Sequence, residues 1–244
     1  GELHEALDER VLLGFGGVSE YGITVRWDKN FLTLAYLTLA RSRNLRIFGG
    51  VRFGGTLTVE DAWSYGFDHV AIAAGAGRPT IIEMKNNLAR GIRKASDFLM
   101  ALQLTGAFKK DAFSNLQVEL PAIVIGGGLT AIDTATELLA YYPVQIEKAA
   151  SRYDALCTEL GAEAVRARFD TEEWSALERH LLHARELAEE KKRAAEEGRP
   201  AAVQALLERW GGVTLVYRKS LADSPAYRLN HEEVEKSLEE GVRY

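Results

Sequence analysis

The sequence contains a single cysteine, Cys157, among its 244 residues. One thiol excludes a disulfide within the chain and any metal cluster held by its cysteines alone. The same scarcity is typical of a reducing compartment, so we expect a cytoplasmic protein. No apolar run approaches the roughly 20 residues of a membrane-spanning helix. The net charge of −5 gives no basic excess of the kind that binds nucleic acid, so we expect neither a membrane nor a nucleic-acid partner.

A catalytic centre of a familiar kind is also missing. We find no Ser/His/Asp, Cys/His or paired-carboxylate pattern, and the catalytic residues therefore stay unknown. His180 and His183 are spaced to share one helix face, but no third ligand accompanies them. A solvated helix face is thus the preferred interpretation, and no metal site is predicted.

The length and the 47% of hydrophobic residues suffice for a core and predict two domains.

The most informative segment is an apolar, β-branched run that ends in three glycines and continues into a helix-like pattern. Residues 122–125 predict a strand, and the helix is expected to extend to about Tyr141. In this context the glycine cluster predicts a dinucleotide-binding loop, with the phosphates on free amides at the helix N-terminus. The predicted cofactor-binding residues of this loop are Gly126, Gly127, Gly128, Leu129, Thr130 and Ala131.

Each position of the loop has its own physical role. Gly126 allows a tight turn, Gly128 lets the backbone approach a pyrophosphate, and Ala131 lets helix and strand pack closely. Thr130 either caps the helix or contacts a phosphate, and the sequence leaves both interpretations open. The competing view is that the loop is only a structural turn.

Two segments compete for the next strand, and the choice decides the nucleotide. Residues 144–147 lie about twenty residues past the motif, and Glu147 at their end would hold the ribose 2′-OH of NAD. Residues 213–217 come much later, but Arg218 and Lys219 follow them and would bind the 2′-phosphate of NADP. We prefer the later segment because its β-branched run is longer. Residues 147–210, rich in Ala, Glu, Lys, Arg and Leu, then become an inserted helical hairpin.

Local signals predict further elements along the chain. Short strands are expected at 45–48 and 51–53, and a buried strand at 67–76. Helices are expected after Thr58, around residues 95–104, after Asp170 and after Asn230, where cap residues or helical spacing occur. A new strand is expected to begin near the last residues, so we expect the chain to be cut from a longer protein.

Taken in order, these segments resemble the glutamate synthase small-subunit family, flavoproteins of the pyridine nucleotide-disulfide oxidoreductase type. The likeness covers most of residues 20–244 apart from the helical insertion. The stretches that carry it are residues 21–23, 67–76, 95–99, 125–133, 216–220 and 239–242.

The resemblance implies an α/β fold: a Rossmann-like three-layer domain with a helical hairpin insertion, beside part of an FAD-binding domain. Residues 1–85 would be the partial FAD-binding domain, with Ala74 and Gly75 near the flavin dinucleotide. Residues 86–118 would be a helical connection, and residues 119–244 the NAD(P)H-binding domain. The first FAD fingerprint and the closing FAD segment of the family are absent, which predicts a middle fragment.

The implied activity is that of an FAD-dependent NADPH oxidoreductase. NADPH would pass hydride to FAD in the complete protein, and electrons would leave to an iron–sulfur or glutamate synthase-type partner subunit. Two alternatives remain: a non-catalytic dinucleotide-binding module with the hairpin as an interaction arm, and an NAD-dependent dehydrogenase that uses Glu147.

Overall fold

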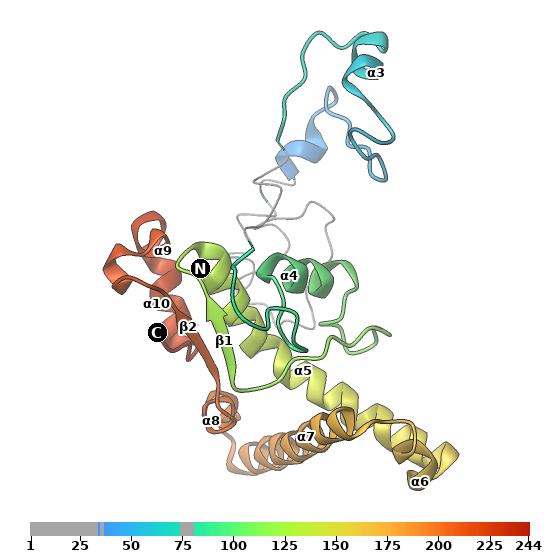
Figure 1. Ribbon diagram of the computed structural model, residues 1–244, viewed down its shortest axis with the longest axis vertical. Helices are drawn as coiled ribbons and strands as arrows, with labels where there is room; N and C mark the ends of the chain where they lie inside the picture. Colours follow the sequence, from blue (N-terminus) through green and yellow to red (C-terminus); the bar gives the residue numbers. More distant parts are fainter. Residues whose placement is uncertain (1–33, 35–36, 74–80) are drawn as a thin grey trace. The chain divides into compact units, whose positions relative to one another are not determined.

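The computed structural model describes residues 34, 37–73 and 81–244 (Figure 1). The described residues fall into two compact units, one within Phe31–Met84 and one within Lys85–Tyr244. Helices predominate in them, and their one sheet has two strands. The prediction of a three-layer Rossmann-like domain is therefore wrong, because the described residues do not form the wide parallel sheet with helices on both faces that it requires. None of the described helices is long and apolar enough to cross a bilayer.

The smaller unit contains helix α3 (Val59–Ser64), which begins as the sequence predicts. Thr58 Oγ1 accepts a hydrogen bond from Asp61 N at 3.1 Å, and Asp61 Oδ2 accepts one from Thr58 N at 2.9 Å. This reciprocal pair satisfies two amides that a helix N-terminus leaves without intrahelical partners.

The strands predicted at 45–48, 51–53 and 67–76 do not form in the described part of this unit. An isolated bridge between Phe53 and Leu57 is the pairing found there. A strand needs a hydrogen-bonded neighbour as well as a suitable composition, and aromatic side chains such as Phe48 and Tyr65 remain exposed. The end of the longest predicted strand, including the cofactor-binding candidates Ala74 and Gly75, lies outside the described residues.

The larger unit is built around two parallel strands, β1 (Ala122–Ile125) and β2 (Val213–Val216). The preferred second strand is thus confirmed. Val124 and Leu215 are buried in the core, whereas Ile123, Ile125 and Val216 alternate onto the other face and are exposed. Past the last helix, Arg243 forms an isolated parallel bridge with Thr214 beside β2, and the described residues form no third strand there.

Helix α5 (Leu129–Leu160) follows the glycine cluster and runs without interruption for 32 residues. The predicted end near Tyr141 is wrong, and so is a strand at 144–147. Pro143 lies inside the helix, where proline is normally unfavourable. Packing overrides this local preference, because the side chains on both sides of it, including Tyr142 and Gln145, are fully buried.

The same part of α5 holds the connection that enters β1. Gln145 pairs with the backbone of Val118, accepting from its N–H at 2.7 Å and donating to its carbonyl at 2.9 Å. One turn on, the Lys148 ammonium donates to three carbonyls at 2.7–3.0 Å. The predicted helical connection is helical only at α4 (Ala95–Leu104), and polar side chains of α5 satisfy much of the remaining backbone. The three carbonyls belong to Ala107, Lys109 and Ser114.

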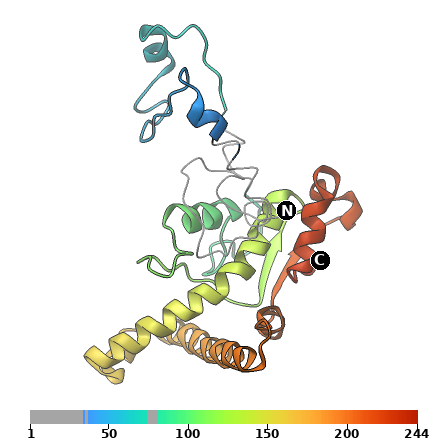
Figure 2. The ribbon, with the colours of Figure 1, turned by 180° about the vertical axis from the view of Figure 1, so that it is seen from behind.

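A helical hairpin separates β1 from β2, as predicted, but its first arm is α5 itself. The chain turns at α6 (Ala162–Arg166) and returns along α5 as α7 (Thr171–Glu197), as Figures 1 and 2 show. Helix α8 (Val203–Arg209) then leads to β2. The helix start predicted after Asp170 is confirmed by a capping box with Glu173.

Both histidines lie where α7 packs against α5, a contact that we call the seam of the hairpin. A solvated helix face is therefore the wrong interpretation for them. The buried His180 lies 3.0 Å from Glu119 Oε1 and 3.1 Å from the Val118 carbonyl. His183 Nδ1 lies 2.7 Å from the Tyr142 hydroxyl, and its ring stacks on Trp210. The described residues contain no group of three metal-ligating side chains.

We expect the hairpin to lose stability as the pH falls from 7.5 to 5.5. Burial lowers the pKa of His183, and the nearby Glu186 opposes this effect only in part. A histidine whose pKa is lower in the folded chain than in the unfolded chain stabilises the fold at pH values above its unfolded pKa of about 6.5. This contribution is lost as the pH falls. Thermal melts should show the decline in the unmodified chain and in His69→Asn, an exposed control, but much less in His183→Asn. Equal slopes of melting temperature against pH in all three proteins would contradict the assignment of the decline to His183.

The residues after β2 form three short helical elements. Ser224 caps the second of them, accepting a hydrogen bond from Tyr227 N at 3.1 Å. The last helix begins after Asn230 as predicted, although the Asn230 side chain bonds Glu233 rather than a backbone amide. The elements are η3 (Leu221–Asp223), α9 (Pro225–Leu229) and α10 (His231–Glu239).

Candidate functional site

The glycine cluster joins the end of β1 to the start of α5, and its first glycine is needed for close packing. Gly126 N donates to the Val216 carbonyl at 3.0 Å, which ties the loop to the end of β2. A Cβ atom on Gly126 would lie 3.0 Å from the Cβ of Ala131. The strand end and the first turn of the helix therefore approach as closely as the sequence pattern predicts.

The middle glycine is held from two sides. A Cβ atom on Gly127 would lie only 2.5 Å from Cδ2 of Tyr217, so the tyrosine ring packs directly on the glycine backbone. The Gly127 carbonyl accepts a hydrogen bond from Ala226 N in α9 at 2.9 Å. The loop is therefore fixed by the segment that follows β2.

The third glycine is open. Gly128 is the N-cap of α5, with φ −101° and ψ 173°, and no atom lies within 4 Å of a Cβ built on it. The backbone N–H groups of Leu129 and Thr130 donate to no other residue that the structure describes. The Thr130 side chain makes no hydrogen bond with another described residue, so it does not cap the helix. Unused amides at an unobstructed helix N-terminus form an arrangement that binds anions.

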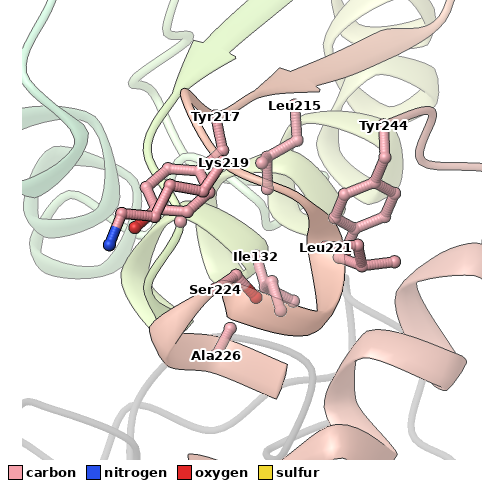
Figure 3. A pocket seen from close by; sticks show the side chains of 9 residues that line it. Ile132, Leu215, Tyr217, Lys219, Leu221, Ser224, Ala226 and Tyr244 are labelled. Carbon is pink, nitrogen blue, oxygen red and sulfur yellow. The ribbon is translucent and has the colours of Figure 1, made fainter. Parts of the chain in front are cut away.

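A cavity of about 240 Å³ lies beside the loop (Figure 3). Its wall combines apolar side chains with the polar groups of Lys219 and Ser224, and both Gly127 and Tyr217 border it. Ligand pockets for whole drug-sized molecules measure ~300–1,000 Å³, so this cavity is smaller than a site that encloses a whole ligand of that size. The lining residues are Gly127, Ile132, Leu215, Tyr217, Lys219, Leu221, Ser224, Ala226 and Tyr244.

The two cations that follow β2 are exposed and available. Neither Arg218 nor Lys219 makes a side-chain hydrogen bond or ion pair with another described residue. Some cations elsewhere in this unit are paired, for example Arg209 with Glu186 at 2.6 Å, whereas others, such as the exposed Arg168, make no ion pair with a described residue. The cavity is lined by Lys219 but not by Arg218, so the two cations face different surroundings.

Glu147 occupies a different place from the one an NAD site requires. It lies within α5 and forms an ion pair with Lys191 of α7. The rise of an α-helix places it about 27 Å along the axis from Leu129. The carboxylate therefore belongs to the hairpin and is remote from the glycine loop.

Sequence reasoning missed three side chains that the structure brings to this site. Tyr217, Ser224 and Tyr244 come from the end of β2, the N-cap of α9 and the segment after α10. The position of Tyr217, at the end of a predicted strand and directly before a basic pair, was the one available signal. The other two depend on how the chain returns to the sheet.

Comparison with known proteins places the chain within a longer relative. No family model matches it. It is 42% identical over 243 residues to the uncharacterized protein RP006 of Rickettsia prowazekii (strain Madrid E). The match covers all of this chain but 32% of that protein, so the chain spans about a third of the relative's length.

Proposed function

We propose that this chain is the NADPH-binding part of an FAD-dependent oxidoreductase. One observation carries the proposal: the open N-terminus of α5 at Gly128 shares a strand–loop–helix–strand unit with two cations after β2 that pair with no other described residue. Pyrophosphate needs unused amides and an approach free of side chains, and a 2′-phosphate needs cations that no other residue neutralises. The described residues offer both.

The residues divide the binding as follows. The pyrophosphate would lie against Gly128 and the amides of Leu129 and Thr130, where the dipole of the long helix favours negative charge. Arg218 would bind the 2′-phosphate with its planar fork of donors, and Lys219 would add a point charge from the cavity side. Binding through these groups orients the nucleotide across the ends of β1 and β2.

The flavin half of the proposal rests on the sequence resemblance. FAD, when bound in the complete protein, would accept hydride from the nicotinamide. The residues described here would hold and orient the nucleotide that delivers it. A chain that spans a third of its relative leaves ample length for a flavin domain and for contacts with an electron-accepting partner.

Parallel calorimetric titrations with NADPH and NADH test the proposal. We expect NADPH to bind at least about tenfold more tightly, because one charge-assisted hydrogen bond contributes roughly 1.5–3 kcal/mol. Arg218→Ala should remove most of this preference. A matched control is Arg168→Ala, an exposed arginine beyond the far end of α5, which should change neither affinity. A preference for NADH, or no binding of either nucleotide, would contradict the proposal.

A further inference from the structure

Tyr217 is the side chain that joins the glycine loop to the basic pair. Its ring packs so closely on Gly127 that a methyl group there would overlap it. The next two residues along the chain are Arg218 and Lys219. Its hydroxyl makes no hydrogen bond with another described residue, so the contribution of this side chain within the chain is the packing of its ring.

We propose that Tyr217 is a positioning residue that sets the preference of the site for a 2′-phosphorylated nucleotide. This inference rests on the proposed function. The pyrophosphate and the 2′-phosphate are separated by the adenosine ribose, so both are bound at once only if the loop and the cations keep a fixed spacing. The packing of the Tyr217 ring keeps the spacing between the loop and the cations fixed.

Without the ring of Tyr217, backbone hydrogen bonds alone would constrain the positions of the two cations less. Gly126 N bonds Val216 O, and Gly127 O bonds Ala226 N. These bonds fix the chain before and after the basic pair, at positions 216 and 226. Between them, Ser220 and Leu221 hold the chain after the pair, through bonds with Asp223 and packing on the core, and Tyr217 supplies the packed contact directly before Arg218. A binding group must be held within about 0.5 Å of its working position to contribute fully.

The consequence differs between the two nucleotides. NADH has no 2′-phosphate and uses only the loop, whereas NADPH uses the loop and the cations together. Loss of the ring should therefore weaken NADPH more than NADH. A residue that only stabilised the fold would weaken both by the same factor.

The test is a pair of titrations, with NADPH and with NADH, on the unmodified chain and on Tyr217→Ala and Tyr217→Phe. We expect Tyr217→Ala to weaken NADPH roughly tenfold, the equivalent of one charge-assisted hydrogen bond, with a much smaller change for NADH. Tyr217→Phe should behave as the unmodified chain, because the ring is kept. Tyr227→Ala, an aromatic of α9 that does not line the cavity, is the matched control and should leave both affinities unchanged.

The outcomes separate this inference from the function on which it rests. If the unmodified chain prefers NADPH and Tyr217→Ala keeps that preference, the inference is wrong and the function stands. An equal loss for both nucleotides would assign Tyr217 a structural role and also overturn it. If the unmodified chain binds neither nucleotide, the function fails and the inference with it. Should Tyr217→Ala melt below the assay temperature, Tyr217→Leu replaces it, with the same loss of preference expected.

Discussion

Replacing Lys148 with methionine is expected to lower the free energy of unfolding by about 3 kcal/mol or more. The side chain is 5% exposed, and its ammonium donates to three backbone carbonyls at 2.7–3.0 Å. Methionine preserves much of the volume but leaves those carbonyls without this donor, at roughly 1–3 kcal/mol for each that stays buried. Relief from burying the charge offsets part of the loss, since burial lowers the pKa of Lys148.

Urea unfolding followed by circular dichroism measures this effect. Lys94→Met is the matched control, because Lys94 is exposed and, among the described residues, forms only a surface pair with Asp97 at 3.3 Å. Exposed pairs contribute about 0–1 kcal/mol. If both substitutions cost the same small amount, the connection before β1 is not held by α5 in the way the contacts indicate.

The second large effect is expected for Gly127→Ala. The new Cβ atom would lie 2.5 Å from the Tyr217 ring, and the backbone of Gly127 does not have a positive φ, so the cost is steric. Overpacking of this kind typically costs about 1–3 kcal/mol. We expect a clear fall in the melting temperature and a loss of NADPH affinity, because relief of the clash moves the loop or Tyr217.

A double-mutant cycle identifies the cause. Tyr217→Ala opens the space that the new methyl group needs, so Gly127→Ala should cost much less in that background. Contacting residues typically show interaction energies of about 0.5–3 kcal/mol in such cycles. Strictly additive effects on urea unfolding would show that Gly127 and Tyr217 do not pack as described.

Local signals in the sequence were sufficient where the structure depends on neighbouring residues. The capping boxes at Thr58 and Asp170 and the strand–glycine–helix passage at β1 and α5 are each specified within a few positions. The preferred second strand was also correct, because the β-branched run that contains Val213–Val216 is longer than that of the competing residues 144–147. Patterns of this range follow directly from hydrogen bonding at helix ends and from strand propensity.

The errors arose where distant parts of the chain decide. Residues 144–147 have a strand-like composition, yet they are helical because Gln145 satisfies the backbone of Val118 and the seam buries this stretch. The strands expected in the smaller unit lack partners in the described residues. The two histidines of α7 are polar residues at a spacing typical of a helix surface. Only the fold shows that His183 contacts Tyr142 and that His180 contacts Glu119.

The candidate site likewise has features that could be predicted from the sequence and features that could not. The loop glycines and the basic pair were recognisable from their order in the sequence. The cavity and the contact of Tyr217 with Gly127 were not, because they depend on how the chain folds back after β2. The exclusion of Glu147 likewise required the length of α5, which no local pattern reveals.

The most direct test of nucleotide binding at the loop is a calorimetric titration of the unmodified chain and of Gly128→Ala with NADPH. Gly128 has open space around it and a backbone conformation that alanine adopts readily. The fold should therefore lose about 1 kcal/mol or less, the typical cost of a poorer N-cap. The methyl group would nevertheless occupy the side on which a pyrophosphate approaches. We predict that Gly128→Ala keeps its melting temperature within a few degrees and binds NADPH at least roughly tenfold more weakly. Unchanged NADPH affinity in a folded Gly128→Ala chain would show that the glycine loop is only a structural turn.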